Sequence, residues 1–276
     1  MTAREVFLSV KSILKHSGIA EPEANAKVIV AHALGISFAD LYSNKVVPER
    51  PLKTIDNMVR RCIKGEPVEY ITGKAYFRYI TLNVSPDVLI PRKETELVVQ
   101  RAIDLIQNNG YHTAADIGTG SGCIAISLAT ETQALICAVD ISEKALKIAQ
   151  HNAVINGVDQ KISFLLSDMF KCLTDTYDIM VCNPPYVSES EYMALDDGIR
   201  LYEPKLALAA GDGLSFYRRI VKDGLRYIRS GGSLVLEIGC SQAASVMELL
   251  GQYGFSGIEC QKDYQGRDRI ISGRKD

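Results

Sequence analysis

The stretch Ala-Ala-Asp-Ile-Gly-Thr-Gly-Ser-Gly at residues 114–122 decides the fold class of this chain. Its apolar first half predicts a buried strand, and the alternating glycines Gly118, Gly120 and Gly122 predict a tight turn into a helix. The spacing Gly-x-Gly-x-Gly differs from the dinucleotide pattern Gly-x-Gly-x-x-Gly, and no Lys-Ser/Thr pair follows to form a nucleotide triphosphate loop. Because ligands of such sheets bind beyond the carboxyl ends of the strands, we predict a ligand site at this turn.

On both sides of this turn, apolar strand patterns alternate with helical periodicity. The expected helices cover residues 94–108, 122–130, 143–156, 213–229 and 241–252. The expected strands cover residues 113–117, 135–139, 161–167, 177–182, 233–238, 257–261 and 269–273. This alternation is typical of an α/β fold with a mostly parallel sheet of seven strands and helices on both faces.

The N-terminal part has a different pattern. Thr2 and Glu5 have the spacing of a capping box, and three apolar stripes with helical periodicity follow before Gly65. The next residues are rich in β-branched and aromatic side chains around Gly73, which predicts a β-hairpin there. We therefore predict a helical bundle over residues 1–70, a hairpin linker over 71–87 and an α/β domain over 88–276.

The composition indicates a cytoplasmic globular protein. The chain has 276 residues, of which 47% are hydrophobic and 23% charged. No apolar run approaches the roughly 18 residues that span a bilayer, and no signal peptide is recognisable. The seven cysteines include no Cys-x-x-Cys pair and lie mostly in apolar segments, so we expect buried, reduced thiols, no disulfide and no metal.

The charge distribution limits the partners. Residues 1–80 carry a net charge of +4, whereas residues 81–276 carry −6. The basic part could face an acidic partner or form an ordinary solvated surface. The pI is near 6.1 and no dense basic block is present, so the chain does not look like a protein that grips long nucleic acid.

Acidic residues follow the next two predicted strands. Asp140 lies 22 residues after Gly118, where a carboxylate can accept the hydroxyls of a ribose or cap the following helix. Asp168 could accept from an adenine amino group, and Met169 would line the ring face or fill the core. In this order, these features favour an adenosine-type ligand.

The sequence Asn-Pro-Pro-Tyr at residues 183–186 ends the fourth predicted strand. Two successive prolines cannot donate backbone hydrogen bonds, so the chain leaves the sheet there with free carbonyls. The Asn183 side chain beside these carbonyls offers an acceptor oxygen and a donor. Such a site could hold a flat NH2 group with the Tyr186 ring over it, or be only a turn that ends a strand.

Together these motifs resemble a class I S-adenosylmethionine-dependent methyltransferase. The tetrapeptide resembles that of enzymes that methylate a planar NH2, in adenine, guanine or glutamine. Three further segments resemble the glutamine methyltransferases of peptide chain release factors, the PrmC/HemK family. These are residues 65–73 (Gly-Glu-Pro-Val-Glu-Tyr-Ile-Thr-Gly), 89–96 (Leu-Ile-Pro-Arg-Lys-Glu-Thr-Glu) and 266–269 (Gly-Arg-Asp-Arg).

The resemblance implies a Rossmann-like domain, S-adenosylmethionine as methyl donor, and the glutamine of the Gly-Gly-Gln motif of class I release factors as substrate. It implies that the catalytic and substrate-binding residues are Asn183, Pro184, Pro185 and Tyr186. It implies that the cofactor contacts Ile117, Gly118, Thr119, Gly120, Ser121, Asp140, Met169 and Asn183. The family often has an aromatic residue where this chain has Met169, and a thioether can also pack on the ring.

Three residues keep two interpretations each. Arg92 would neutralise a carboxylate at the site or pair with Glu94, and Phe77 would overhang the cofactor or pack in the hairpin. Glu237 ends a predicted strand, where it would line the pocket or cap the strand, and we assign it no role.

Two other functions stay open at this point. A DNA or RNA amino-methyltransferase would have to hold a flipped base and its phosphates, which the pI and the absence of a basic insert disfavour. A binding module without turnover would not need the complete set of Gly118, Gly120, Asp140 and Asn183.

Overall fold

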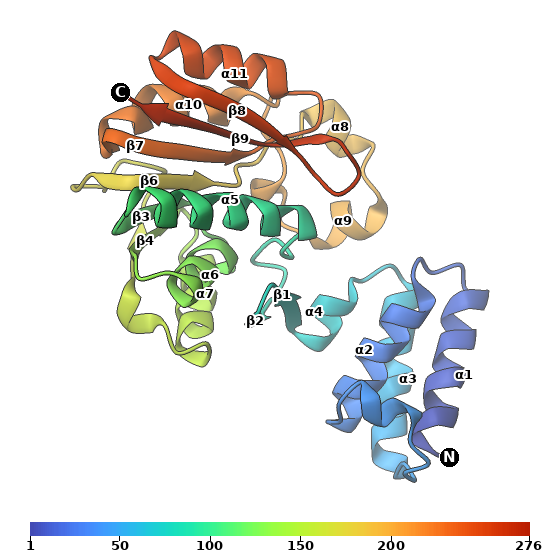
Figure 1. Ribbon diagram of the computed structural model, residues 1–276. Coiled ribbons are helices and arrows are strands. Elements are labelled where there is room, and N and C mark those ends of the chain that lie inside the picture. The colour runs from blue at the N-terminus through green and yellow to red at the C-terminus, as the bar shows by residue number, and fades with distance from the viewer. The chain divides into compact units, whose positions relative to one another are not determined.

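The computed structural model describes residues 1–276 and divides the chain into two compact units. A helical unit contains Met1–Lys74 and Asp196–Tyr202, and an α/β unit contains Ala75–Leu195 and Glu203–Asp276 (Figure 1). The expected classes, a helical N-terminal region and a Rossmann-like α/β fold, are confirmed. Nothing in the local pattern predicted that residues 196–202 would join the helical unit.

The helical unit has its own hydrophobic core. It consists of α1 (Ala3–His16), α2 (Pro22–Leu34), the 3-10 turn η1 (Ala39–Tyr42), α3 (Glu49–Ile63), α4 (Val68–Thr72) and α9 (Asp197–Tyr202). The capping box is confirmed, because the Glu5 N–H donates to Thr2 Oγ1 at 3.2 Å and the Thr2 N–H donates to Glu5 Oε2 at 2.9 Å. Helix α9 is fastened to α3 by the Tyr202 hydroxyl, which donates to the Lys64 carbonyl at 3.3 Å.

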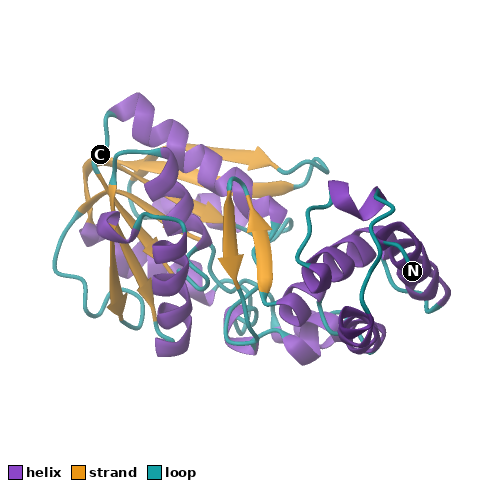
Figure 2. Cartoon of the chain, turned by 90° about the horizontal axis from the view of Figure 1, so that it is seen from below, coloured by secondary structure: helices purple, strands orange, loops and turns teal.

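The expected β-hairpin is confirmed, but the strand-like residues just before Gly73 are helical. Residues Val68–Thr72 form α4, which Gly73 ends in the left-handed conformation at φ 70°. The Thr72 hydroxyl donates to the Val68 carbonyl at 2.9 Å, so a residue with high strand propensity is satisfied within a helical turn. The hairpin begins one residue later, with β1 (Lys74–Phe77) and β2 (Ile80–Asn83) (Figure 2).

The α/β unit contains the expected seven-stranded sheet, in the order β5-β4-β3-β6-β7-β9-β8. The five parallel strands are β3 (Thr113–Ile117), β4 (Leu135–Asp140), β5 (Ile162–Leu166), β6 (Tyr177–Cys182) and β7 (Ile228–Glu237). Strands β9 (Asp268–Lys275) and β8 (Phe255–Lys262) are antiparallel. Because neighbouring parallel strands end at the same edge, the turns after β3, β4, β6 and β7 lie together.

Side-chain alternation along the strands separates two apolar layers. Ala114 and Val181 face the layer of α5 (Lys93–Asn109), α6 (Cys123–Glu131) and α7 (Glu143–Ile155). Their neighbours Ala115 and Met180 face the layer of α10 (Ser215–Gly224) and α11 (Ala243–Gln252). Figures 1 and 2 show helices on both sides of this sheet.

Two boundary expectations were wrong. The helix expected over residues 213–229 ends at Gly224, and β7 already begins at Ile228 after the 3-10 turn η4 (Leu225–Tyr227). A Cβ at Gly224 would lie 2.8 Å from the Phe170 ring, so this position needs glycine for packing.

The segment after the Asn-Pro-Pro-Tyr sequence also contains α8 (Glu189–Met193) and the turn η3 (Lys205–Ala207), which are too short to show a period in the sequence.

All seven cysteines are free thiols, and Cys62, Cys137 and Cys182 are buried. The expected burial was wrong for Cys172 and Cys240, which are exposed. None of the helices combines the length and the apolar composition that a membrane span requires.

Candidate active site

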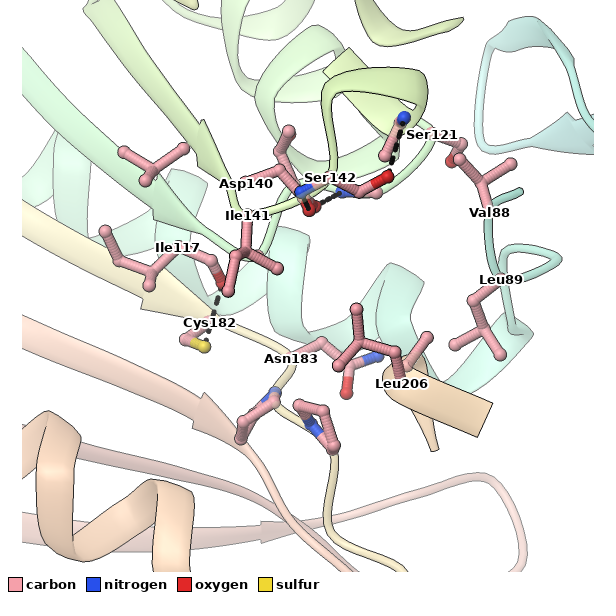
Figure 3. A pocket seen from close by; sticks show the side chains of 18 of the residues that line it. Val88, Leu89, Ile117, Ser121, Asp140, Ile141, Ser142, Cys182, Asn183 and Leu206 are labelled. Atoms are coloured by element: carbon pink, nitrogen blue, oxygen red, sulfur yellow. Dashed lines mark hydrogen bonds between the residues drawn. The ribbon is translucent and has the colours of Figure 1, made fainter. Parts of the chain in front are cut away.

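A cavity of about 520 Å3 lies at the carboxyl ends of the parallel strands. It has the size and the mostly apolar wall of a site for a small molecule. Figure 3 shows Asp140, Ile141 and Ser142 on one side of the cavity and Asn183 and Leu206 on the opposite side. The lining residues that the sequence predicted are Ile117, Gly118, Thr119, Gly120, Ser121, Asp140, Asp168, Met169, Asn183, Pro184 and Pro185.

The glycine turn after β3 exposes its backbone to this cavity. Gly118 and Gly120 have φ angles of 77° and 54°, and a Cβ on either would meet no protein atom within 4 Å. Gly122 has another role, because a Cβ there would lie 2.9 Å from Ile126 and 3.2 Å from Ala149. The first two glycines therefore leave space for a ligand, whereas Gly122 allows α6 and α7 to pack closely.

Asp140 connects this turn to the end of β4. Its Oδ2 accepts from the Gly120 N–H and its Oδ1 accepts from the Ser142 N–H, both at 2.8 Å. Burial raises the pKa of the carboxyl, against the hydrogen bonds that stabilise its charge. The cap of α7 is Ser142, whose hydroxyl accepts from the Ala145 N–H at 3.2 Å. A carboxylate has about four acceptor positions, so Asp140 keeps capacity for two ribose hydroxyls.

The turn after β5 contributes Asp168 and Met169. Asp168 pairs with Lys171 and Arg219 at 2.8 Å each, and these two partners lower the pKa of its carboxyl. Met169 is buried and takes a φ of 53°, which is unusual for a residue with a side chain. Arg219 also lines the cavity, although no sequence pattern indicated it.

The turn after β6 brings Asn183, Pro184 and Pro185 to the cavity wall. The Asn183 Nδ2 donates to Thr95 Oγ1 at 3.1 Å. Tyr186 is not a lining residue. Its hydroxyl donates to Glu237 Oε1 at 3.2 Å and its carbonyl accepts from Gln242 Nε2 at 3.0 Å, so the tyrosine anchors the turn.

Glu237, at the end of β7, lies behind this wall and is 1% exposed. Its Oε2 accepts from the Thr95 hydroxyl at 2.6 Å. Burial raises the pKa of Glu237 to about 7, although the hydrogen bond from Thr95 and the positive charge of Arg269 act in the opposite direction. Glu237 therefore neither lines the cavity nor only caps a strand, because it accepts from Thr95 of α5 and from Tyr186 of the turn after β6.

The structure also places the two other residues that had alternative interpretations, Arg92 and Phe77. Arg92 lines the cavity and pairs with the buried Glu203, so of its two interpretations the pairing with Glu94 was wrong. The other Glu203 oxygen accepts from the Ile90 N–H at 3.3 Å, which holds the segment before α5 against the cavity. Phe77 is 1% exposed within the hydrophobic core, and packing is its role.

Sequence reasoning missed Thr95, Glu203 and Gln242 as parts of this site. Thr95 lies within the 89–96 segment that carries the family resemblance, so that signal was present. The roles of Glu203 and Gln242 depend on hydrogen bonds to distant segments, and nothing in their local sequence marks them.

The raised pKa of Glu237 predicts a pH effect on stability. A carboxyl with a folded-state pKa of about 7 and an ordinary value of 4.5 binds its proton more tightly in the folded protein. Its contribution to stability is therefore complete below about pH 4.5 and is lost as the pH rises through 7. Between about pH 5 and pH 8, we expect the free energy of unfolding of wild type to fall by about 2–3 kcal/mol relative to that of Glu237→Gln.

Urea unfolding of both proteins at the two pH values measures this difference. Glu248→Gln is the matched control, because Glu248 is exposed on α11 of the same unit. Equal pH dependence in wild type and Glu237→Gln would contradict the prediction.

The fold and the cavity define a class I methyltransferase. Residues 95–199 match the family described as Methyltransferase small domain. A methyltransferase from Pyrococcus furiosus shares the fold with a TM-score of 0.53 and 17% identity, over 80% of this chain and 100% of that one. The Thermus thermophilus 16S rRNA N2 G1207 methyltransferase, in complex with AdoMet and guanosine, has the same TM-score and identity. The match covers 74% of this chain and 50% of that one.

The relatives in sequence are more specific. Residues 5–73 match the PrmC N-terminal domain. The release factor glutamine methyltransferase of Chlorobaculum tepidum is 37% identical, over 97% of this chain and 95% of the relative. The protein of that name from Geobacter sulfurreducens is 36% identical, over 99% of this chain and 96% of the relative. The chain belongs to the release factor glutamine methyltransferase family.

Proposed function

We propose that this chain methylates the side-chain amide nitrogen of the glutamine in the Gly-Gly-Gln motif of class I release factors. The methyl donor is S-adenosylmethionine, which leaves as S-adenosyl-L-homocysteine, and the reaction takes place in the cytoplasm. The proposal is carried by one observation: Asn183, Pro184 and Pro185 line the same cavity as the glycine turn and Asp140. The near-full-length likeness to release factor glutamine methyltransferases supports the choice of substrate.

The residues of the cavity fit the methyl donor. Its volume of about 520 Å3 suits a nucleoside-sized ligand, and Gly118 and Gly120 have no Cβ to occupy the space beside their backbone. Asp140 would accept the ribose hydroxyls, and Asp168 and Met169 would contact the adenine. When bound, S-adenosylmethionine supplies a methyl group on a positively charged sulfur, which a weak nucleophile can attack.

The turn after β6 would hold the glutamine amide. The Asn183 NH2 group donates to Thr95, which leaves the Asn183 Oδ1 to accept one amide N–H. The Pro184 carbonyl would accept the other N–H, since a proline turn leaves carbonyls unpaired. Two acceptors orient the nitrogen and stabilise the positive charge that grows on it.

No general base is needed before methyl transfer in this arrangement. The amide nitrogen becomes strongly acidic once its new bond to carbon forms, so one of its two protons is released to water after the transfer. Tyr186 does not line the cavity, and it would act by holding the turn that carries Asn183, through the hydrogen bond from its hydroxyl to Glu237. The protein therefore contributes position and charge stabilisation.

Labelled S-adenosylmethionine tests the assignment directly. The chain is incubated with an intact class I release factor, with the same factor carrying Ala in place of the motif glutamine, and with DNA and RNA. We expect label only in the intact factor. Label in nucleic acid alone would identify an amino-methyltransferase of bases, and cofactor binding without any transfer would identify a binding module.

The role of Asp140 is tested by Asp140→Ala. The variant loses the acceptor for ribose hydroxyls and the partner of the Gly120 N–H. We expect the Kd for S-adenosylmethionine to rise about 10–100-fold, because charged hydrogen bonds contribute about 1.5–3 kcal/mol. Isothermal titration calorimetry measures the change, with Asp223→Ala, an exposed residue of α10, as control. An unchanged Kd would remove Asp140 from the cofactor site.

A further inference from the structure

We propose that Thr95 and Glu237 are positioning residues that fix which end of the Asn183 amide faces the substrate. The inference rests on the proposed function, because it concerns how Asn183 presents its acceptor. The three side chains come from three separate elements: Thr95 from the first turn of α5, Glu237 from the end of β7 and Asn183 from the turn after β6. They form one continuous chain of hydrogen bonds, in which Asn183 and Thr95 line the cavity and Glu237 lies behind them.

The direction of each hydrogen bond follows from donor and acceptor chemistry. At pH 8, above the pKa of about 7, the Glu237 carboxylate is ionised and only accepts, so the single proton of the Thr95 hydroxyl points to Glu237 Oε2, 2.6 Å away. The Thr95 oxygen then has only lone pairs left for its other neighbour. Asn183 lies 3.1 Å from that oxygen and must direct its NH2 group there. The Asn183 carbonyl oxygen is thereby left for the cavity.

This direction matters because the two ends of an asparagine amide have nearly the same shape. A half-turn about the last side-chain bond exchanges the oxygen for the NH2 group without a steric penalty. With the NH2 group toward the cavity, a donor would face the donor N–H of the substrate amide. Only the orientation that the Thr95–Glu237 pair selects can accept from the substrate.

Glu237 also holds the far end of the same turn. Its second oxygen accepts from the Tyr186 hydroxyl at 3.2 Å, so one buried carboxylate fastens both Asn183, through Thr95, and Tyr186. Arg269 lies close enough to favour the ionised form of Glu237, and it is itself held by the Ile238 carbonyl at 2.9 Å. The buried carboxylate thus has one nearby positive charge and two hydroxyl donors.

The test compares Thr95→Val, which removes the hydroxyl at constant shape, with Thr95→Ser, which retains it. Assays are run at about pH 8 with S-adenosylmethionine and an intact release factor. We expect Thr95→Val to lower kcat about 10–100-fold, with the Kd for S-adenosylmethionine changed less than about threefold. Thr95→Ser should recover kcat to within about threefold of wild type. Thr132→Val, which removes a buried hydroxyl bonded to the Leu128 carbonyl, is the control and should leave kcat unchanged.

A double-mutant cycle distinguishes positioning from general support of the fold. If Thr95 acts through the Asn183 amide, Thr95→Val should have no further effect on kcat in an Asn183→Ala background. A full additional loss in that background, or wild-type kcat for Thr95→Val alone, would overturn the inference. Wild-type kcat for Asn183→Ala would instead refute the proposed role of Asn183, so the two failures are separate.

Discussion

Asn183→Ala is expected to lower kcat for glutamine methylation about 100–1,000-fold. The change removes the acceptor that orients the amide nitrogen and stabilises its developing charge, and the loss of one such preorganised group typically costs a factor of this size. Asn183 is one of several expected cofactor contacts, and the glycine turn and Asp140 are unaltered, so the Kd for S-adenosylmethionine should rise by less than about tenfold. Single-turnover kinetics with an intact release factor and calorimetric titration of the cofactor measure the two quantities.

Asn156→Ala is the matched control. Asn156 ends α7 and its side chain donates to the Thr81 and Asn152 carbonyls at 2.9 and 2.8 Å, but it does not line the cavity. Its loss should reduce stability and leave kcat intact. Near-wild-type turnover of Asn183→Ala with normal cofactor affinity would show that the amide is held elsewhere.

Deletion of residues 1–64 is expected to abolish methylation of an intact release factor while cofactor binding persists. We propose that the helical unit docks the release factor. It carries exposed large apolar side chains, with Leu8 49% and Tyr42 54% exposed, as docking surfaces often do. The loss should be on the order of 1,000-fold, since each 1.4 kcal/mol of lost docking energy costs a factor of about ten.

The deletion uncovers part of the helical core. Val68 and Ile71 of α4 pack in that core, so the truncated chain should carry Ser at both positions to stay in solution. A short peptide containing Gly-Gly-Gln serves as control substrate, because it can reach the cavity without docking. We expect similar slow methylation of the peptide by full-length and truncated chains. Unchanged methylation of the intact factor by the truncated chain would exclude the docking role.

Much of the fold and of the cavity was predictable because the decisive signals are local. The apolar strand before Gly118, the apolar strand before Asp140 and the run that ends at Asn183 each identify a buried strand. In a parallel sheet these carboxyl ends lie at one edge, so a linear pattern sufficed to bring the three turns to one cavity. The structure confirms that they line it together.

The errors have a physical cause in each case. Residues 70–73 have strand-type composition, but the short helix α4 between Pro67 and Gly73 satisfies the backbone groups of this segment. Arg92 pairs with the buried Glu203, which is 111 residues away in the sequence, instead of with the nearby Glu94. Short helices such as α8 and α9 contain too few residues to show a period.

The residues of this chain specified its strands, its glycine turn and its family through patterns that a few neighbouring positions carry. Tertiary packing added the hydrogen bond that the Thr95 hydroxyl donates to Glu237, 142 residues away, and the one that the Asn183 NH2 group donates to Thr95, 88 residues away. No local pattern encodes such pairs, because a hydroxyl and a carboxylate become partners only when folding removes water from both. The direction in which Asn183 points its oxygen is therefore a property of the assembled core.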